Sequence, residues 1–118
     1  MLLKPRLAGV FYSPMKSIAL LIKDTSTATP AALRYARALI RSGNPPVSVF
    51  FLGRGVCQAT EVVNEDWREI KRLGGVGLIL CSASAEKFGI SGDAEFDIAG
   101  LGELIASGLD GTRVISFG

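Results

Sequence analysis

Cys81 is the residue of this sequence with the clearest capacity for chemistry. It ends the apolar run at residues 76–80 and precedes a small, polar stretch at residues 82–87, a change that predicts a buried strand leading into a helix. At such a junction the free backbone N–H groups of the first helical turn stabilise a thiolate, which is the form of cysteine that attacks sulfur. Free cysteines are also among the most buried residues, so an inert place in the core is the alternative interpretation.

Three other side chains are candidates for binding a substrate beside this thiol. Lys23 ends the first apolar run, Arg54 lies just past the second, and Ser82 follows Cys81 directly. In an open parallel sheet the carboxyl ends of the strands share one edge, where ligands bind. A cation at that edge lowers the pKa of a nearby thiol by favouring its charged form. The alternative for Lys23 and Arg54 is an ordinary solvated cation.

The residue types that the sequence lacks exclude several kinds of active site. The chain has 118 residues with no histidine and with two cysteines, Cys57 and Cys81, which excludes Ser-His and Cys-His pairs and histidine metal sites. Two cysteines without clustered carboxylates do not predict a zinc site, and we expect neither metal nor cofactor. The segment Gly53-Arg54-Gly55 fits neither glycine-rich phosphate-binding motif and predicts a tight turn.

The elements that must position these residues follow from the apolar pattern. Short, continuous apolar runs are typical of strands covered on both faces, and they occupy residues 17–22, 47–52, 76–81 and 113–117. Helical spacing of apolar residues lies between these runs, with proline near the first helix start and glycines after the helix ends. It predicts helices at residues 29–40, 61–73, 82–88 and 98–108.

This alternation predicts an α/β fold, a three-layer α/β/α sandwich with a mainly parallel sheet of four to five strands. We expect the first strand to lie between the second and the third, which would separate the loops that carry Cys57 and Cys81 by about 10 Å, or two strand spacings. Residues 15–118 are expected to form a single domain. Residues 1–14 are interpreted as an N-terminal extension outside the fold, because Met15 resembles an alternative start.

Composition limits the partners and the compartment. The net charge is +2 and the basic residues are spread among acids, so direct binding of nucleic acid is not expected. Hydrophobic residues make up 48% of the chain, which suggests a subunit contact. No apolar run approaches the roughly 18 residues that span a bilayer, the N-terminal segment is a poor signal peptide, and the cysteines are not arranged as a CxxC pair. We therefore expect a cytoplasmic protein without a membrane anchor.

Four segments together carry a resemblance to a known family. They read Leu-Ile-Leu-Cys at residues 78–81, Ser-Val-Phe-Phe-Leu-Gly-Arg-Gly-Val at 48–56, Phe-Asp-Ile-Ala-Gly-Leu-Gly-Glu-Leu at 96–104 and Asp-Gly-Thr-Arg-Val-Ile-Ser-Phe at 110–117. In order and spacing, over about residues 15–118, the chain resembles the DsrE/TusD-like sulfur-relay (DsrE/DsrF-like) family. The resemblance implies a carrier of sulfur as a cysteine persulfide between partner proteins, in tRNA thiolation or sulfur oxidation. Cys81 falls on the sulfur-carrying cysteine, whereas Cys57 departs from the family pattern.

The leading hypothesis is accordingly a sulfurtransferase that holds sulfane sulfur on Cys81 and passes it between donor and acceptor proteins. The alternative is a non-catalytic assembly subunit or a small-ligand binding module of the same fold, with Cys81 buried. We expect a homo-oligomer, a trimer or hexamer, or a heteromer with paralogues. Cys57 is expected to be dispensable for sulfur loading.

Overall fold

The protein is built on a five-stranded parallel sheet. The computed structural model describes residues 17–24, 28–103 and 112–118. The strands lie in the order β4-β3-β2-β1-β5, and each pairs in parallel with its neighbours. Their bounds are β1 Ile18–Ile22, β2 Ser48–Phe51, β3 Gly77–Cys81, β4 Phe96–Ala99 and β5 Arg113–Phe117. The α/β fold with a parallel sheet is therefore confirmed.

The connecting helices follow local signals that the sequence carries. Pro30 stands in the first turn of α1 (Thr29–Arg41), where its missing N–H costs nothing. Helix α2 (Asn64–Gly74) has acids in its first turn and bases in its last, and Gly75 ends it at a φ of 65°. The remaining helices are the 3-10 helix η2 (Gly53–Ala59) and the short α3 (Ser82–Phe88). The segment that carries Cys57, expected as a loop that begins with a tight turn at residues 53–55, is thus a 3-10 helix.

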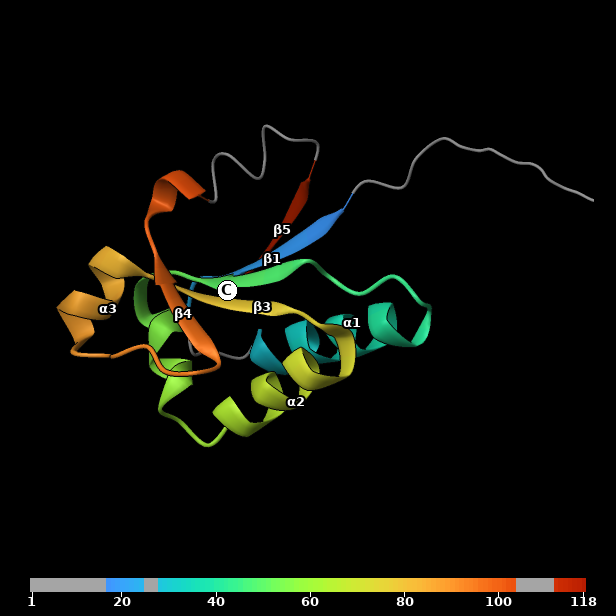
Figure 1. Ribbon diagram of the computed structural model, residues 1–118, viewed down its shortest axis with the longest axis horizontal. Coiled ribbons are helices and arrows are strands. Elements are labelled where there is room, and N and C mark those ends of the chain that lie inside the picture. The colour runs from blue at the N-terminus through green and yellow to red at the C-terminus, as the bar shows by residue number, and fades with distance from the viewer. Residues whose placement is uncertain (1–16, 25–27, 104–111) are drawn as a thin grey trace, which may run out of the picture.

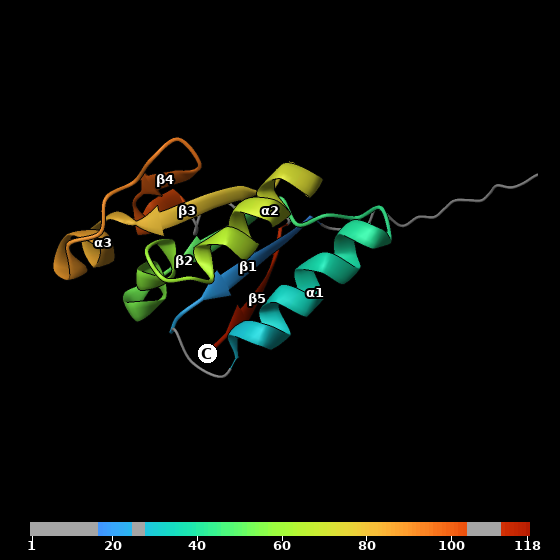
Figure 2. The same cartoon turned by 90° about the horizontal axis from the view of Figure 1, so that it is seen from below.

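Helices α1 and α2 cover the same face of the sheet, as Figures 1 and 2 show. Alternate strand residues point to this face, where Phe51 packs edge-on against Trp67 of α2 with ring centroids 5.4 Å apart. Phe96 of β4 extends the aromatic cluster and lies 5.7 Å from Phe51. The buried core on this side also includes Leu20, Ile22, Ala32, Leu33, Ala36, Val49, Ile70, Leu78 and Leu80.

The opposite face of the sheet carries the second set of alternating residues, among them Phe50 and Cys81. A helical stretch at Leu101–Glu103 lies on this side, across the sheet from α1 and α2 (Figure 1). The connection from β4 to β5 then continues through residues 104–111, which lie outside the described residues. Of the helix expected on this face, the described residues include Leu101–Glu103.

The expected position of the first strand is wrong. The pairing Leu21↔Phe50 joins β1 to β2, and Phe50↔Ile79 joins β2 to β3, so the second strand lies between the first and the third. The chain steps through β1, β2, β3 and β4 in one direction before it returns to the far side of β1. Right-handed crossovers in one direction place α1 and α2 on one face. The apolar runs specify strands but not their order.

The expected fourth helix is wrong at its beginning. Residues 96–99 form the edge strand β4, in which Leu80 is paired with Ile98, and helical structure starts only at Leu101. Buried Phe96 alternates with exposed Asp97, a strand pattern too short to outweigh the helical spacing of the apolar residues that follow. The rest of the expected helix, with Leu104, Ile105 and Gly108, lies outside the described residues.

Two further boundaries concern α2 and the N-terminus. Helix α2 begins at Asn64, three residues later than expected, because turns closed by the 2.8 Å bond from the Asn64 N–H to the Glu61 carbonyl precede it. The expected domain boundary between residues 14 and 15 lies outside the described residues.

Among the residues that the structure describes, no helix is both long enough and apolar enough to cross a membrane.

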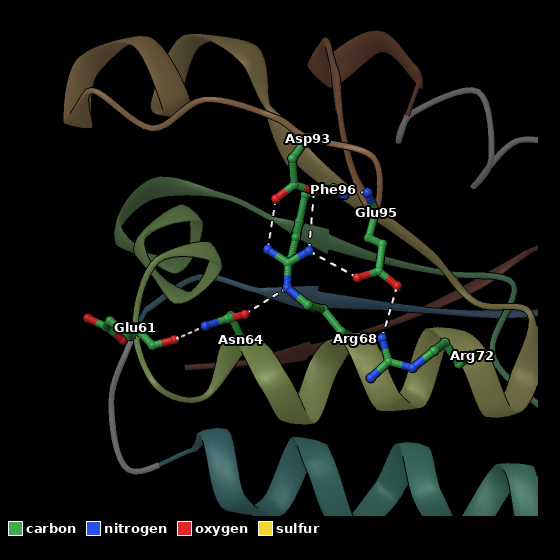
Figure 3. Close-up of polar contacts among 7 residues, drawn as sticks. All are labelled: Glu61, Asn64, Arg68, Arg72, Asp93, Glu95 and Phe96. Carbon is green, nitrogen blue, oxygen red and sulfur yellow. Dashed lines mark hydrogen bonds and ion pairs between the residues drawn. The ribbon is translucent and has the colours of Figure 1, made fainter.

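Edge strand β4 is fixed to α2 by a group of ion pairs, drawn in Figure 3. The Arg68 guanidinium donates to Asp93 at 2.7 Å and to Glu95 at 3.0 Å, and it lies 4.8 Å from the centre of the Phe96 ring. Arg72 also contacts Glu95 at 3.2 Å. One Asp93 oxygen accepts the backbone N–H groups of Glu95 and Phe96. Together these contacts fold the turn that leads into β4.

Candidate functional site

Cys81 is the last residue of β3 and occupies the position just before α3. The register aligns Ile22, Phe51 and Leu80 across three adjacent strands. The next residues, Lys23, Leu52 and Cys81, therefore lie side by side at the carboxyl edge of the sheet, with Lys23 two strands from Cys81. Cys81 lies on the opposite face of β3 from Leu80, away from the core under α1 and α2.

Cys81 is only 4% exposed, whereas a thiol in a turn at the edge of the sheet would be partly exposed. The reason is that Cys81 still belongs to the paired strand, in register with Ala99 of β4, instead of lying in a turn. Burial raises the pKa of the thiol. Interactions with the backbone N–H and the hydroxyl of Ser84, and with the backbone N–H of Ala83, outweigh burial and leave the pKa below its ordinary value.

These donors lie in the first turn of α3, and this position explains why they lower the pKa of the Cys81 thiol. Cys81 stands at the N-cap of α3, the position that precedes the free N–H groups two and three residues ahead, and its sulfur accepts no capping hydrogen bond of standard geometry. Because α3 has only seven residues, we attribute the lowered pKa to these nearby donors and not to a long-range dipole.

Ser84 is the residue that joins the cysteine to a neighbouring segment. Its Oγ accepts a 2.8 Å hydrogen bond from the backbone N–H of Gly53, the first residue of η2. Gly53 has a φ of 58°, a conformation that glycine adopts without strain. Helices α3 and η2 lie next to each other at the carboxyl edge of the sheet (Figures 1 and 2). The Ser84 hydroxyl thus joins η2 to the first turn of α3, which directly follows Cys81.

The position of η2 is fixed by close packing against the end of β1. Gly55 approaches the carbonyl group of Ile22 so closely that a Cβ atom at this position would clash with it. The backbone N–H of Leu52 donates to the same carbonyl oxygen at 2.8 Å. Glycine at residue 55 is therefore required for η2 to cross the end of β1.

A buried polar side chain, Gln58, holds the other end of η2. Its Nε2 donates to the Asp24 carbonyl at 2.8 Å and to Thr29 Oγ1 at 2.9 Å, and its Oε1 accepts the Trp67 indole N–H at 2.7 Å. These bonds link η2 to the end of β1, the start of α1 and the middle of α2. Both N–H groups of the Gln58 amide donate and its oxygen accepts, so each polar atom of this buried amide has a partner.

The other predicted site residues lie at the same edge but differ in their contacts. Lys23, Arg54 and Ser82 are all exposed. The Arg54 guanidinium lies 5.6 Å from the centre of the Phe88 ring, as does the Lys87 ammonium. Phe88 ends α3, roughly 10 Å along the helix axis from Cys81. The structure therefore places Arg54 and Lys87 together at the outer end of α3.

The second cysteine lies in η2. Cys57 is half-buried, and both Cys57 and Cys81 are free thiols. The expected separation of their loops by two strand spacings does not apply, because β2 and β3 are adjacent. Among the described residues, no group of three or more His, Cys, Asp or Glu side chains could hold a metal ion.

Sequence reasoning missed Ser84 and Gln58. Ser84 stands three residues after Cys81, and this spacing between a helix cap and the third helical residue is a recognisable signal. Gln58 carries no such signal, because a lone glutamine in a loop gives no indication that it is buried.

Comparisons with known proteins agree with this geometry. Residues 16–117 match the model of the DsrE/DsrF-like family. The sulfurtransferase TusD of Salmonella arizonae is 30% identical to this chain over 110 residues, which cover 74% of this chain and 86% of that protein. The sulfurtransferases TusD of Cronobacter sakazakii and Erwinia tasmaniensis are each 28% identical over 110 residues, with the same coverage.

Proposed function

Because this chain belongs to the DsrE/DsrF-like family, we propose that it is a sulfurtransferase that carries sulfane sulfur as a persulfide on Cys81. The observation that carries the proposal is the placement of Cys81 at the carboxyl end of β3, where donors from Ala83 and Ser84 lower its pKa despite burial. A thiolate at this position is the one property that persulfide exchange requires of a protein. The names of the similar sulfurtransferases point to the same chemistry.

The proposed reaction has two exchange steps that balance without a cofactor. In the first, the Cys81 thiolate attacks the terminal sulfur of a donor persulfide, the donor S–S bond breaks, and the donor leaves as a thiolate with the electron pair. In the second, an acceptor thiolate attacks the terminal sulfur of the Cys81 persulfide, and Cys81 leaves as the thiolate. In both steps the proton on the transferred sulfur stays with that sulfur, and no net oxidation occurs.

Burial of Cys81 adds a requirement to this proposal. With 4% of the residue exposed, a donor sulfur reaches Cys81 only when the residues that cover it move. The same cover would keep a bound persulfide away from other thiols between the two steps. We propose that contact with the donor or acceptor protein opens this site.

The exposed residues at the same edge are the proposed binding residues for the partners. Lys23, Arg54 and Ser82 are exposed near the ends of β1, β2 and β3, and we propose that they contact the sulfur-bearing segment of the donor or acceptor. Arg54 and Lys87 lie on the same aromatic ring of α3. Two cations that share one ring would favour an acidic segment of a partner.

The proposed setting is a cytoplasmic assembly. Two free thiols suit a reducing compartment. Exposed apolar side chains, including Val62 with 89% exposure and Leu101 with 47%, suit contacts with further subunits. We propose a homo-oligomer, a trimer or hexamer, or a heteromer with paralogues, without direct contact to nucleic acid or membrane. A monomeric mass in light scattering at micromolar concentration contradicts this part of the proposal.

Burial of Cys81 also favours the second candidate, an assembly subunit or small-ligand module with an inert cysteine. Mass spectrometry of the intact protein after incubation with a sulfane-sulfur donor such as polysulfide separates the two. The sulfurtransferase gains 32 Da on wild type, gains it on Cys57→Ser, and gains nothing on Cys81→Ser. An unchanged mass of wild type, or sulfur that stays on Cys81→Ser and disappears with Cys57→Ser, contradicts the proposal.

A further inference from the structure

We infer that the Ser84 hydroxyl is a hydrogen-bond donor to the Cys81 sulfur, oriented for this task by the backbone N–H of Gly53. The inference rests on the proposed function for its purpose and extends it from the nucleophile to the group that activates it. Ser84 would thereby link the ionisation of the Cys81 thiol to the position of η2.

The first step of the argument is the direction of the Gly53–Ser84 hydrogen bond. A hydroxyl group has one hydrogen to donate and two lone pairs to accept with. The Gly53 N–H donates to Ser84 Oγ at 2.8 Å, and this bond occupies one lone pair of the oxygen. The hydroxyl hydrogen then points away from Gly53 and is available to a second neighbour.

The second step is the identity of that neighbour. Cys81 is the N-cap of α3 and Ser84 is its third helical residue, so the two side chains lie on the same side of the first turn. The Ser84 hydroxyl and its backbone N–H are also among the groups that lower the pKa of the Cys81 thiol. A hydroxyl that already accepts one hydrogen bond is polarised and donates a stronger one.

The third step concerns what would be lost without the hydroxyl. Burial disfavours an ionised Cys81, and a hydrogen bond to a buried anion is stronger than one between neutral groups. Alanine at residue 84 would keep the helix and its backbone N–H but would remove the donor from the sulfur. It would also leave the Gly53 N–H without its acceptor at the start of η2.

The experiment follows the reactivity of Cys81 in a Cys57→Ser background, so that every modified thiol is Cys81. The rate of alkylation by iodoacetamide is measured from pH 5 to pH 11 for the parent, Ser84→Ala, Ser84→Thr and Ser91→Ala. The plateau rate at high pH reports access to the thiol, and the midpoint reports its ionisation. Ser91→Ala is the control, because Ser91 is an exposed serine beyond the end of α3.

We expect Ser84→Ala to move the midpoint to higher pH and to slow alkylation about tenfold at pH 7 relative to the plateau, as the loss of one hydrogen bond to a charged group implies. Ser84→Thr, which keeps the hydroxyl, should restore the midpoint, and Ser91→Ala should leave it unchanged. A midpoint that does not move in Ser84→Ala, or one that moves equally in Ser91→Ala, overturns the inference. A shift in Ser84→Ala that Ser84→Thr fails to reverse, with both variants folded by circular dichroism, also overturns it.

The alkylation experiment and the sulfur-uptake experiment can fail independently of each other. If wild type takes up no sulfur but Ser84→Ala still moves the alkylation midpoint, the proposed function fails and the inference stands. If wild type takes up sulfur and the midpoint does not depend on Ser84, the inference fails and the proposed function stands.

Discussion

The indole N–H of Trp67 donates a 2.7 Å hydrogen bond to the side-chain carbonyl of Gln58, and both side chains are completely buried. Trp67 belongs to α2, which packs under the sheet, whereas Gln58 belongs to η2 at the carboxyl edge. The bond therefore connects the core of the protein to the segment that contacts Ser84. Because a buried amide cannot exchange its partners for water, this connection resists movement.

The first prediction is that Gln58→Leu lowers the free energy of unfolding by about 2–4 kcal/mol, since it leaves the Trp67 N–H and the Thr29 hydroxyl without a buried partner. Chemical denaturation measures the change, and Glu61→Gln, at an exposed residue nearby, serves as the control. Trp67→Phe in the Gln58→Leu background should cost less than Trp67→Phe alone. If the losses in free energy of unfolding of the two single variants simply add up in the double variant, the hydrogen bond between Gln58 and Trp67 contributes little.

The second prediction concerns the contact between η2 and β1. Gly55→Ala should lower the free energy of unfolding by about 1–3 kcal/mol, because its Cβ would clash with the rigid backbone carbonyl of Ile22. Gly100→Ala is the matched control, since a Cβ at residue 100 meets open space. If both variants unfold at the same denaturant concentration as wild type, η2 does not pack on β1 as described.

The third prediction is a dependence of stability on acid that comes from Asp93. The hydrogen bond from Arg68, followed by the backbone N–H of Phe96, holds the pKa of this carboxyl far below its usual range. A carboxyl with a lowered pKa in the folded state stabilises the protein above its unfolded pKa of about 4, and this contribution is lost as the pH falls below that value.

Asp93→Asn should therefore reduce the loss of stability between about pH 4 and pH 2, while lowering stability modestly at pH 7. Because Asp93 is 45% exposed, the effect at neutral pH is expected to be small. Thermal unfolding across this pH range measures it, with Asp97→Asn on β4 as the control. An acid dependence that is the same in Asp93→Asn and wild type contradicts the prediction.

The fourth prediction separates the chemistry of Cys81 from its contribution to stability. Cys81→Ser should change the free energy of unfolding by less than about 1 kcal/mol, because serine is a favoured N-cap and its hydroxyl accepts the free N–H groups of α3. Cys81→Ala, which lacks an acceptor, should be the less stable of the two variants. Denaturation compares them, and a more stable Cys81→Ala would show that apolar packing dominates at this position.

Much of the fold was predictable because the signals are local. The runs of apolar residues in β1, β2, β3 and β5, and the helical spacing of α1, α2 and α3, lie within segments of about a dozen residues. The junction that makes Cys81 a candidate is local as well, since it depends on a strand that ends where a helix begins. The sequence by itself therefore determined the fold class, most of the elements and the position of the cysteine at the carboxyl edge.

Tertiary structure decided the features that depend on contacts between distant residues. The bond between Gly53 and Ser84 joins positions 31 residues apart, and the bond from Gln58 to Asp24 joins positions 34 apart. Strand order, the burial of Cys81 and the choice of strand over helix at Phe96–Ala99 have the same origin. Strand pairing and burial are set by which surfaces meet after the chain has folded, and the spacing of residues within one segment does not encode that choice.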